Sequence, residues 1–168
     1  MTNPWLEISP NDYESHMASP EVRQLQALNK IFRNCLTKLK PKSVAILGCC
    51  TGNGFEHIDP SITERVVGID INPKFLSITM DRFSFSIPNL ELLEFDISND
   101  ELEIQPVDLV FGALIFEYVD IEKGRANIRK ILKPGGHFVA CLQMPSESCS
   151  VVTPTPYKSL EKLTQICH

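Results

Sequence analysis

The sequence contains no long apolar run. Its longest stretch of consecutive apolar residues, 109–116, is eight residues long, whereas a helix that crosses a bilayer needs about 20. The first seven residues (MTNPWLE) have neither the basic segment nor the apolar segment of a secretory signal peptide. We therefore expect a cytoplasmic protein with no membrane-spanning helix.

Cysteine pairs, histidine clusters and an excess of positive charge are also missing. The six cysteines include no C-x-x-C pair, and the four histidines form no H-E-x-x-H motif. We therefore expect neither a metal site nor a disulfide framework. Lys and Arg number 16 against 21 Asp and Glu, which gives a net charge of −5. This balance argues against nucleic acid as a partner.

Strand-like and helix-like segments alternate along the chain. Its 168 residues, 43% of them hydrophobic and 22% charged, fit one ordinary domain. Short apolar runs predict strands at 43–47, 65–70, 90–95, 109–114 and 137–142. Apolar residues at helical spacing predict helices at 20–40, 73–83, 121–133 and 157–167. This order predicts an α/β fold with a doubly wound parallel sheet.

A glycine-rich loop, residues 48–54 (GCCTGNG), follows the first predicted strand. It lacks the G-K-S/T of a phosphate-binding loop, and a dinucleotide pattern started at Gly52 fails at His57. Asp70 and Asp96 end the second and third predicted strands. Taken alone, each acid is more often a helix cap or a solvated turn residue. Together with the loop they predict a pocket for an adenosine-containing ligand at the carboxyl ends of the strands.

Six segments in order carry a resemblance to a known family. They are 44–54 (VAILGCCTGNG), 67–70 (VGID), 95–97 (FDI), 108–113 (DLVFGA), 116–120 (FEYVD) and 132–136 (LKPGG). In their order and spacing the sequence resembles the class I S-adenosylmethionine-dependent methyltransferases over about residues 12–143. The resemblance implies a Rossmann-like fold and methyl transfer from S-adenosylmethionine to an acceptor, with a small molecule expected and S-adenosylhomocysteine as the product.

The resemblance also implies which residues bind the cofactor. The loop from Gly48 to Gly52 would pass beneath the methionine part, Asp70 would hold the ribose, and Asp96 would bind the adenine edge. An N-terminal segment, 1–19, would fold over the cofactor as a lid. The complete implied set is Tyr13, Gly48, Cys49, Cys50, Gly52, Asp70, Ile71, Asp96, Ile97, Gly112 and Ala113.

Two positions in the first motif depart from the family pattern. Many members carry an acid where this chain has Ile46, and they commonly have Gly where it has Cys50. Loss of the acid removes a charge-assisted interaction worth about 1–3 kcal/mol, and the Cys50 side chain stands where the backbone must approach the ligand. We expect both departures to weaken cofactor binding without preventing it.

The C-terminal segment departs from the family as well. Residues 144–168, which follow a core at 20–143 within the one expected domain, begin with a stretch rich in Pro and Ser. They are too few to supply the two further strands with which the family sheet usually ends, so the sequence is expected to be shorter than a full family domain. We predict a five-stranded sheet in the order 3-2-1-4-5 whose fifth strand is an exposed edge. Such an edge favours pairing with a second copy of the chain.

The sequence assigns no catalytic residue. Methyl transfer mainly needs alignment of donor and acceptor, and a base is needed only when the acceptor must lose a proton. His16, Glu117 and Tyr118 are the candidates near the expected opening of the pocket. Two alternatives stay open: a module that binds S-adenosylmethionine or S-adenosylhomocysteine without turnover, and a nicotinamide-dependent oxidoreductase.

Overall fold

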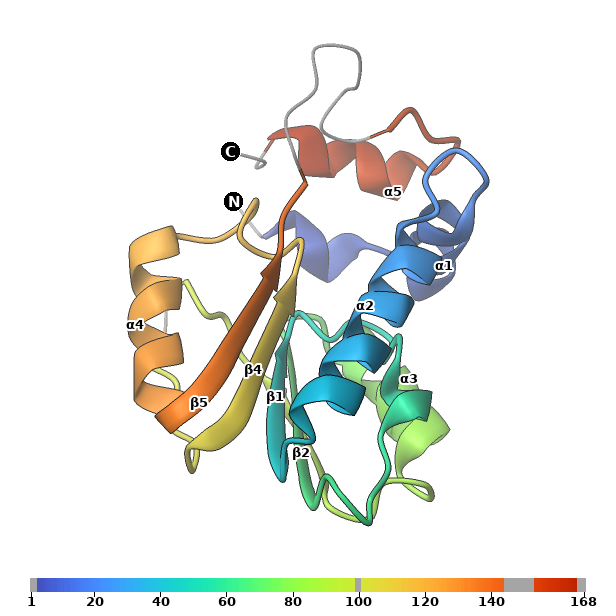
Figure 1. Cartoon of the computed structure of the whole chain (residues 1–168). Helices are drawn as coiled ribbons and strands as arrows, with labels where there is room; N and C mark the ends of the chain where they lie inside the picture. The colour runs from blue at the N-terminus through green and yellow to red at the C-terminus, as the bar shows by residue number, and fades with distance from the viewer. Residues whose placement is uncertain (1–2, 99–100, 144–152, 166–168) are drawn as a thin grey trace.

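A computed structural model describes residues 3–98, 101–143 and 153–165 (Figure 1). Its elements are, in order, η1 (Pro4–Glu7), α1 (Pro10–Ala18), α2 (Gln24–Leu39), β1 (Ser43–Leu47), η2 (Phe55–His57), β2 (Arg65–Asp70), α3 (Pro73–Phe83), β3 (Leu90–Glu94), β4 (Val107–Ala113), α4 (Ile121–Ile131), β5 (Leu132–Cys141), α5 (Lys158–Glu161) and η3 (Lys162–Gln165). None of the described helices is long and apolar enough to cross a membrane.

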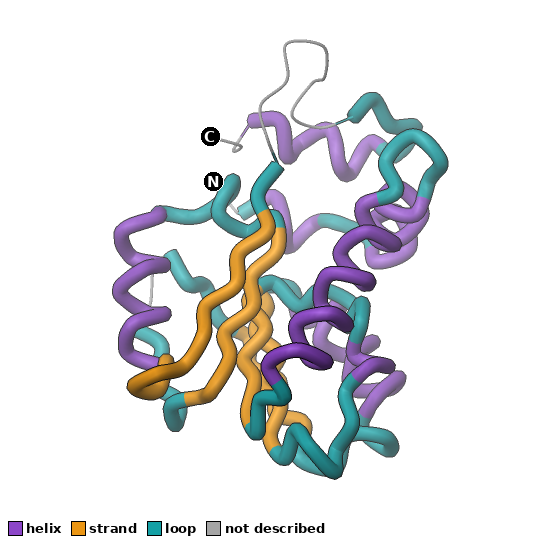
Figure 2. The backbone as a smooth tube through the Cα atoms, viewed as in Figure 1, coloured by secondary structure: helices purple, strands orange, loops and turns teal. Residues whose placement is uncertain are grey.

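The five strands form one sheet in the order β3-β2-β1-β4-β5, with every neighbouring pair parallel. The predicted order is therefore confirmed. All five residues of β1 are buried, because helices cover both faces of the sheet (Figure 2). A parallel sheet places the carboxyl ends of its strands at one edge, so the loops after β1, β2, β3 and β4 meet there.

Two apolar clusters hold the helices to the sheet. On one face, α2 and α3 contribute Phe32, Leu36 and Leu76, which pack against alternate residues of β1, β2 and β4. On the other face, α4 contributes Ile128 and Ile131, which pack against the remaining alternate residues. Because successive strand side chains point to opposite faces, a strand buried on both faces reads as a continuous apolar run.

A third cluster closes the carboxyl-end edge of the sheet. It joins Ile8, Phe75, Leu160 and Leu163, which come from the N-terminal segment, α3 and the two C-terminal helical turns. Figure 1 shows α1 and α5 gathered beyond the ends of the strands. The two ends of the described chain thus meet over the same edge of the sheet.

Helix boundaries follow local signals in part. The side chain of Asn72 accepts the N–H of Lys74 at the start of α3, and that of Asp120 accepts the N–H of Lys123 at the start of α4. Helix α2 begins at Gln24 and not at residue 20, because Arg23 has a φ of 53°, outside the helical region. The boundary predicted at Pro20 was therefore wrong.

Strand β5 is longer than predicted and includes the segment 134–136 (PGG). Its register with β4 shifts between Val107 and Leu109, which accommodates the extra residues. Proline is tolerated there because β5 lies at the edge of the sheet, where one row of N–H groups needs no partner strand. Within the described ranges, no strand pairs with the outer side of β5.

Candidate functional site

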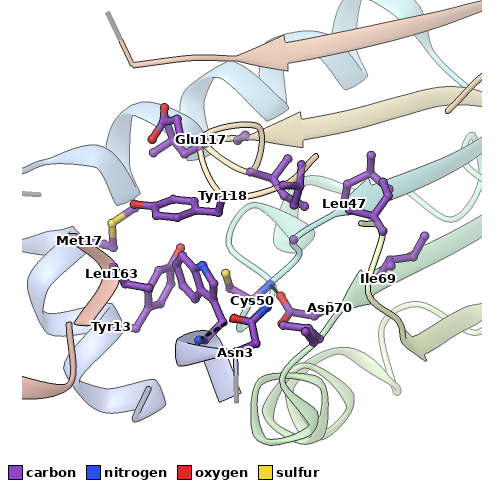
Figure 3. Close-up of a pocket in the computed structure, with 18 of the residues that line it drawn as sticks. Asn3, Tyr13, Met17, Leu47, Cys50, Ile69, Asp70, Glu117, Tyr118 and Leu163 are labelled. Carbon is purple, nitrogen blue, oxygen red and sulfur yellow. Dashed lines mark hydrogen bonds between the residues drawn. The ribbon is translucent and has the colours of Figure 1, made fainter. Parts of the chain in front are cut away.

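A cavity of about 250 Å³ lies at the carboxyl ends of the strands. Its walls come from the loops after β1, β2, β3 and β4, from the N-terminal segment with α1, and from α5 and η3 (Figure 3). Ligands of open α/β sheets bind at this edge. The volume lies just below the range of about 300–1,000 Å³ that is usual for small-molecule sites.

Most of the residues implied by the family resemblance line this cavity. They are Tyr13, Gly48, Cys50, Asp70, Ile71, Asp96, Ile97 and Ala113. They come from five separate segments of the chain, so they come together only in the folded state. The cavity is the candidate site.

Three of the implied residues do not line the cavity. Cys49 is buried beside Gly68, and a Cβ built on Gly68 would lie 3.1 Å from the Sγ atom of Cys49. The space beside Gly52 is filled by Phe83, since a Cβ built there would lie 2.7 Å from Phe83 Cε2. The space beside Gly112 is filled by Phe116, since a Cβ built there would lie 3.1 Å from Phe116 Cε2. These close contacts give all three a role in packing.

The loop after β1 turns through left-handed backbone conformations. Gly48, Cys50 and Gly52 have φ values of 64°, 47° and 81°, a region that L-residues other than glycine adopt at a cost of about 1–2 kcal/mol. The N–H of Cys49 donates to the carbonyl oxygen of Ile69, at 3.1 Å, and so holds the loop against β2. Cys50 is therefore a strained non-glycine residue at the centre of the loop.

Asp70, the last residue of β2, is the electrostatic centre of the site. Its carboxylate accepts the N–H of Cys50 at 2.8 Å and the N–H of Asn72 at 2.9 Å. The residue is 6% exposed, and this burial raises the pKa of the carboxyl to about 6 although its hydrogen bonds oppose the shift. At neutral pH the cavity thus holds a buried carboxylate.

The Cys50 thiol lies between the N-terminal segment and Asp70. The Tyr13 hydroxyl and the Asp70 carboxylate are both beside it. Burial and, next, the negative charge of Asp70 raise the pKa of the Cys50 thiol. The thiol therefore stays protonated, a hydrogen-bond donor and not a nucleophile.

Asp96 lies beside Asp70 because β3 pairs with β2. The N–H of Phe95 donates to the Asp70 carbonyl oxygen, and the Asp96 side chain accepts the N–H of Ser98 at 2.9 Å. Both acids thus face the same cavity from adjacent strand ends. This is the arrangement that the sequence pattern predicts.

The N-terminal segment is fastened over the site by polar contacts. The carboxylate of Glu14 pairs with Arg82 of α3 and accepts the Thr51 hydroxyl at 2.6 Å; the bond with Arg82 is the main cause of the lowered pKa of Glu14. The buried amide of Asn72 donates to the carbonyl oxygens of Trp5 and Ile8. Contacts to α3 and to the loop after β1 therefore hold this segment in place.

Several lining residues lie outside the set implied by the resemblance. They are Asn3, Trp5, Met17, Gln24, Leu28, Leu47, Ile69, Phe95, Ser98, Leu114, Ile115, Val119, Gln143, Thr153, Leu160 and Leu163. The i, i+3 spacing of Leu160 and Leu163 indicates an apolar helix face, but no sequence feature says what this face covers. Trp5 stands in a segment without helical periodicity.

The three catalytic candidates also line the cavity. His16 is buried, and burial lowers the pKa of its imidazole, so it is neutral at pH 7. Glu117 accepts the N–H of Gln143 at 2.9 Å. Tyr118 packs edge-on against Trp5, with ring centroids 5.1 Å apart. Among the residues that the structure describes, no cluster of three or more His, Cys, Asp or Glu could hold a metal ion.

The two departures from the family pattern lie in different surroundings. Ile46 is buried within the core cluster under α2 and does not line the cavity. Cys50 lines the cavity and touches the side chains of Tyr13 and Asp70. Of the two, only Cys50 directly changes the shape and the hydrogen bonding of the site.

Comparison with known proteins finds similarity to methyltransferases. A family model described as a methyltransferase domain matches residues 45–140. An uncharacterized methyltransferase-like protein of Schizosaccharomyces pombe is 29% identical over 90 residues, which cover 54% of this chain and 34% of that protein. The chain thus spans about a third of the length of this curated relative.

Solved structures share the fold. The N-methyltransferase NodS from Bradyrhizobium japonicum, in complex with S-adenosylhomocysteine, is 21% identical with a TM-score of 0.62, over 83% of this chain and 72% of that one. Coclaurine N-methyltransferase, bound to N-methylheliamine and S-adenosylhomocysteine, is 18% identical with a TM-score of 0.57, over 70% of this chain and 35% of that one. At these identities the likeness concerns the fold.

Proposed function

The chain belongs to the methyltransferase domain family, and from this premise we propose that it binds S-adenosylmethionine and transfers its methyl group to a small-molecule acceptor. The observation that carries the proposal is the convergence of Gly48, Asp70 and Asp96 on one cavity at the ends of three adjacent strands. Each of these residues offers what an adenosine ligand needs: close backbone approach or a carboxylate acceptor.

The donor set fits this cofactor. An ionised carboxylate offers about four acceptor positions. The N–H groups of Cys50 and Asn72 occupy two of those on Asp70, and the Cys50 thiol lies beside the carboxylate. The thiol is not part of the loop backbone. The ribose hydroxyls can therefore displace the thiol from the Asp70 carboxylate without disturbing the loop after β1.

We propose that Asp70 holds the ribose, that Ile71, Asp96 and Ile97 hold the adenine, and that the loop from Gly48 to Cys50 with Ala113 holds the methionine part. When bound, S-adenosylmethionine supplies a methyl group on a positively charged sulfur. The chain's own task is then to align the acceptor with that group and to exclude water. The N-terminal segment acts as the lid, because it supplies Trp5 and Tyr13 to the wall of the cavity.

Calorimetric titration with S-adenosylmethionine, S-adenosylhomocysteine and NAD tests the proposal. Micromolar binding of the first two without NAD binding supports it, whereas binding of NAD alone overturns it in favour of an oxidoreductase. The second candidate, a binding module without turnover, is favoured by the strained Cys50 in the loop. Formation of S-adenosylhomocysteine from S-adenosylmethionine during incubation with acceptors decides against the module.

Replacing Cys50 by Gly is expected to tighten S-adenosylhomocysteine binding about threefold to tenfold. The change removes the thiol that competes for Asp70 and removes a Cβ from a residue with a φ of 47°. The melting temperature should change little, because relief of backbone strain offsets the added freedom of the unfolded chain. In the matched control, Cys50→Ser, a donor to Asp70 is kept. Equal affinity of both variants, measured by calorimetry, contradicts this explanation.

A cytoplasmic location is part of the proposal. The four cysteines in the described ranges, Cys35, Cys49, Cys50 and Cys141, carry free thiols, as is usual in a reducing compartment. Cell fractionation tests it: the chain in the cytosolic fraction supports this location, and the chain in a secreted fraction contradicts it.

We further propose that the outer edge of β5 pairs with a second copy of the chain. All ten residues of this strand are exposed or half-buried, and Phe138 is 42% exposed. An unpaired edge of ten residues offers a row of backbone donors and acceptors.

The variant Ala140→Lys is expected to convert such a dimer into a monomer, since charged side chains on an edge oppose pairing. Light scattering coupled to gel filtration measures the mass. Ala27→Lys, at an exposed position of α2, is the control and should stay dimeric. A monomeric wild type contradicts the proposal.

A further inference from the structure

We propose, resting on the methyl transfer proposed above, that the acceptor is an amine that binds as a cation between Glu117 and the rings of Trp5 and Tyr118. These three side chains line the same cavity as the candidate cofactor residues. They come from the loop after β4 and from η1, so the subsite lies between the sheet edge and the lid.

The charge of the cavity is the first argument. Of the described residues that line it, three are carboxylates, Asp70, Asp96 and Glu117, and none is Lys or Arg. His16 does not offset them, because its burial keeps the imidazole neutral at pH 7. In the proposed function Asp70 and Asp96 bind the ribose and the adenine of the cofactor, which leaves the carboxylate of Glu117 for a second ligand.

Glu117 is held in place by neighbours that do not neutralise it. Its carboxylate accepts the backbone N–H of Gln143 at 2.9 Å, and the side chain of Gln143 accepts a hydrogen bond from Gln24 at 3.0 Å. No ion pair joins Glu117 to a cationic side chain within the part of the chain that the structure describes. A fixed, half-buried carboxylate in a cavity lined mostly by apolar residues attracts a cation more strongly than one in water.

Aromatic rings supply the rest of the subsite. The rings of Trp5 and Tyr118 meet at 85° with centroids 5.1 Å apart, and those of Trp5 and Tyr13 meet at 66° with centroids 6.2 Å apart. Rings at such angles pack edge to face and do not stack flat on one another, so each pair covers at most one face of either ring. Ring faces attract ammonium groups. In the view of Figure 3, Glu117 and Tyr118 are drawn above Asp70, apart from the candidate ribose position.

An amine satisfies the chemistry of the transfer. The bound ammonium group first gives one proton to the Glu117 carboxylate, which returns it to water. The nitrogen lone pair then forms a bond to the methyl carbon while the carbon–sulfur bond breaks and its electron pair stays on sulfur. The products are a methylated ammonium ion and a neutral sulfide, so charge and electrons balance. Glu117 would serve both as the anionic anchor and as the first proton acceptor.

The test compares choline with 3,3-dimethylbutan-1-ol, in which a carbon atom replaces the charged nitrogen. Trp5 is the single tryptophan of the chain and lines the cavity, so its fluorescence reports binding of either probe with S-adenosylhomocysteine at saturation. We expect choline to bind at least about tenfold more tightly than its neutral analogue. Glu117→Gln should remove this preference, whereas Glu103→Gln, an exposed control, should keep it.

Two results overturn different claims. Equal binding of the two probes to the wild type, or an unchanged preference in Glu117→Gln, overturns the amine subsite and leaves the proposed function standing. Absence of S-adenosylhomocysteine binding in a calorimetric titration without either probe overturns the proposed function itself. The circular dichroism of each variant establishes that it is folded before the probes are compared.

Discussion

The variant Asp70→Asn is expected to bind S-adenosylhomocysteine about a hundredfold more weakly than the wild type. Hydrogen bonds to a charged acceptor contribute about 1.5–3 kcal/mol each, and a ribose offers two hydroxyls to this carboxylate. The substitution keeps the size of the side chain but removes the charge. Calorimetric titration at pH 8, where the wild-type carboxyl is ionised, measures the effect.

Asp81→Asn is the matched control, because Asp81 is an exposed acid of α3. It makes the same change in net charge, and its affinity should equal that of the wild type. A loss of less than about threefold in Asp70→Asn, with the control unchanged, contradicts the assignment of the ribose to Asp70.

The same carboxyl predicts a pH dependence of binding. Burial raises the pKa of Asp70 to about 6, and the ribose hydroxyls donate only to its ionised form. Affinity should therefore rise with pH up to about 6, by close to tenfold per pH unit well below that value, and level off above it. Affinity measured from pH 5 to 8 tests this, with Asp70→Asn expected to show a flat profile.

Folding stability should respond to pH in the opposite direction. The pKa of Asp70 is higher in the folded protein than the usual value of 3.8, so the folded state binds more protons between these two values. The contribution of this carboxyl, about 3 kcal/mol, is complete below pH 3.8 and is lost as pH rises through about 6. Urea unfolding of wild type and Asp70→Asn at several pH values isolates it.

Gly52→Ala is expected to lower the free energy of unfolding by about 2–5 kcal/mol. A Cβ at this position would lie 2.7 Å from Phe83 Cε2 and 3.1 Å from Thr79 Cγ2, and overpacking of this kind costs about 1–3 kcal/mol. The φ of 81° adds about 1–2 kcal/mol for a residue with a side chain. Urea unfolding monitored by circular dichroism measures the loss.

Gly135→Ala separates the two causes. Its φ of 78° is nearly the same, but a Cβ there would meet nothing within 4 Å. This control should lose only the backbone part, about 1–2 kcal/mol. Equal losses in the two variants would mean that the contact with Phe83 costs nothing. Gly52 would then be available for a role beyond packing.

The sheet and its two acids were predictable because strong local patterns specify them. Apolar runs such as 43–47 and 65–70 form strands wherever helices cover both faces. In a parallel sheet, residues that end adjacent strands must meet at one edge, which brings Asp70 and Asp96 together. Position in the sequence was thus enough to predict their shared location.

The part of the cavity wall that α5 and η3 form was not predictable in the same way. Leu160 and Leu163 contact residues more than 80 positions earlier in the chain, including Phe75, and no local periodicity identifies such a partner. Two glycines are a related case. Gly52 and Gly112 stand in motifs that suggest a ligand, and side chains from α3 and from the loop after β4 fill the space beside them. Packing across distant segments decides both features.

A crystal structure of the chain grown with saturating S-adenosylhomocysteine would locate the cofactor itself. We expect the ribose hydroxyls within hydrogen-bond distance of the Asp70 carboxylate. We also expect the adenine against Ile71 and Asp96, and the methionine part over the loop from Gly48 to Cys50. Density for the ligand away from both acids, or a cavity without ligand at that concentration, would mean that Asp70 and Asp96 do not form the cofactor site.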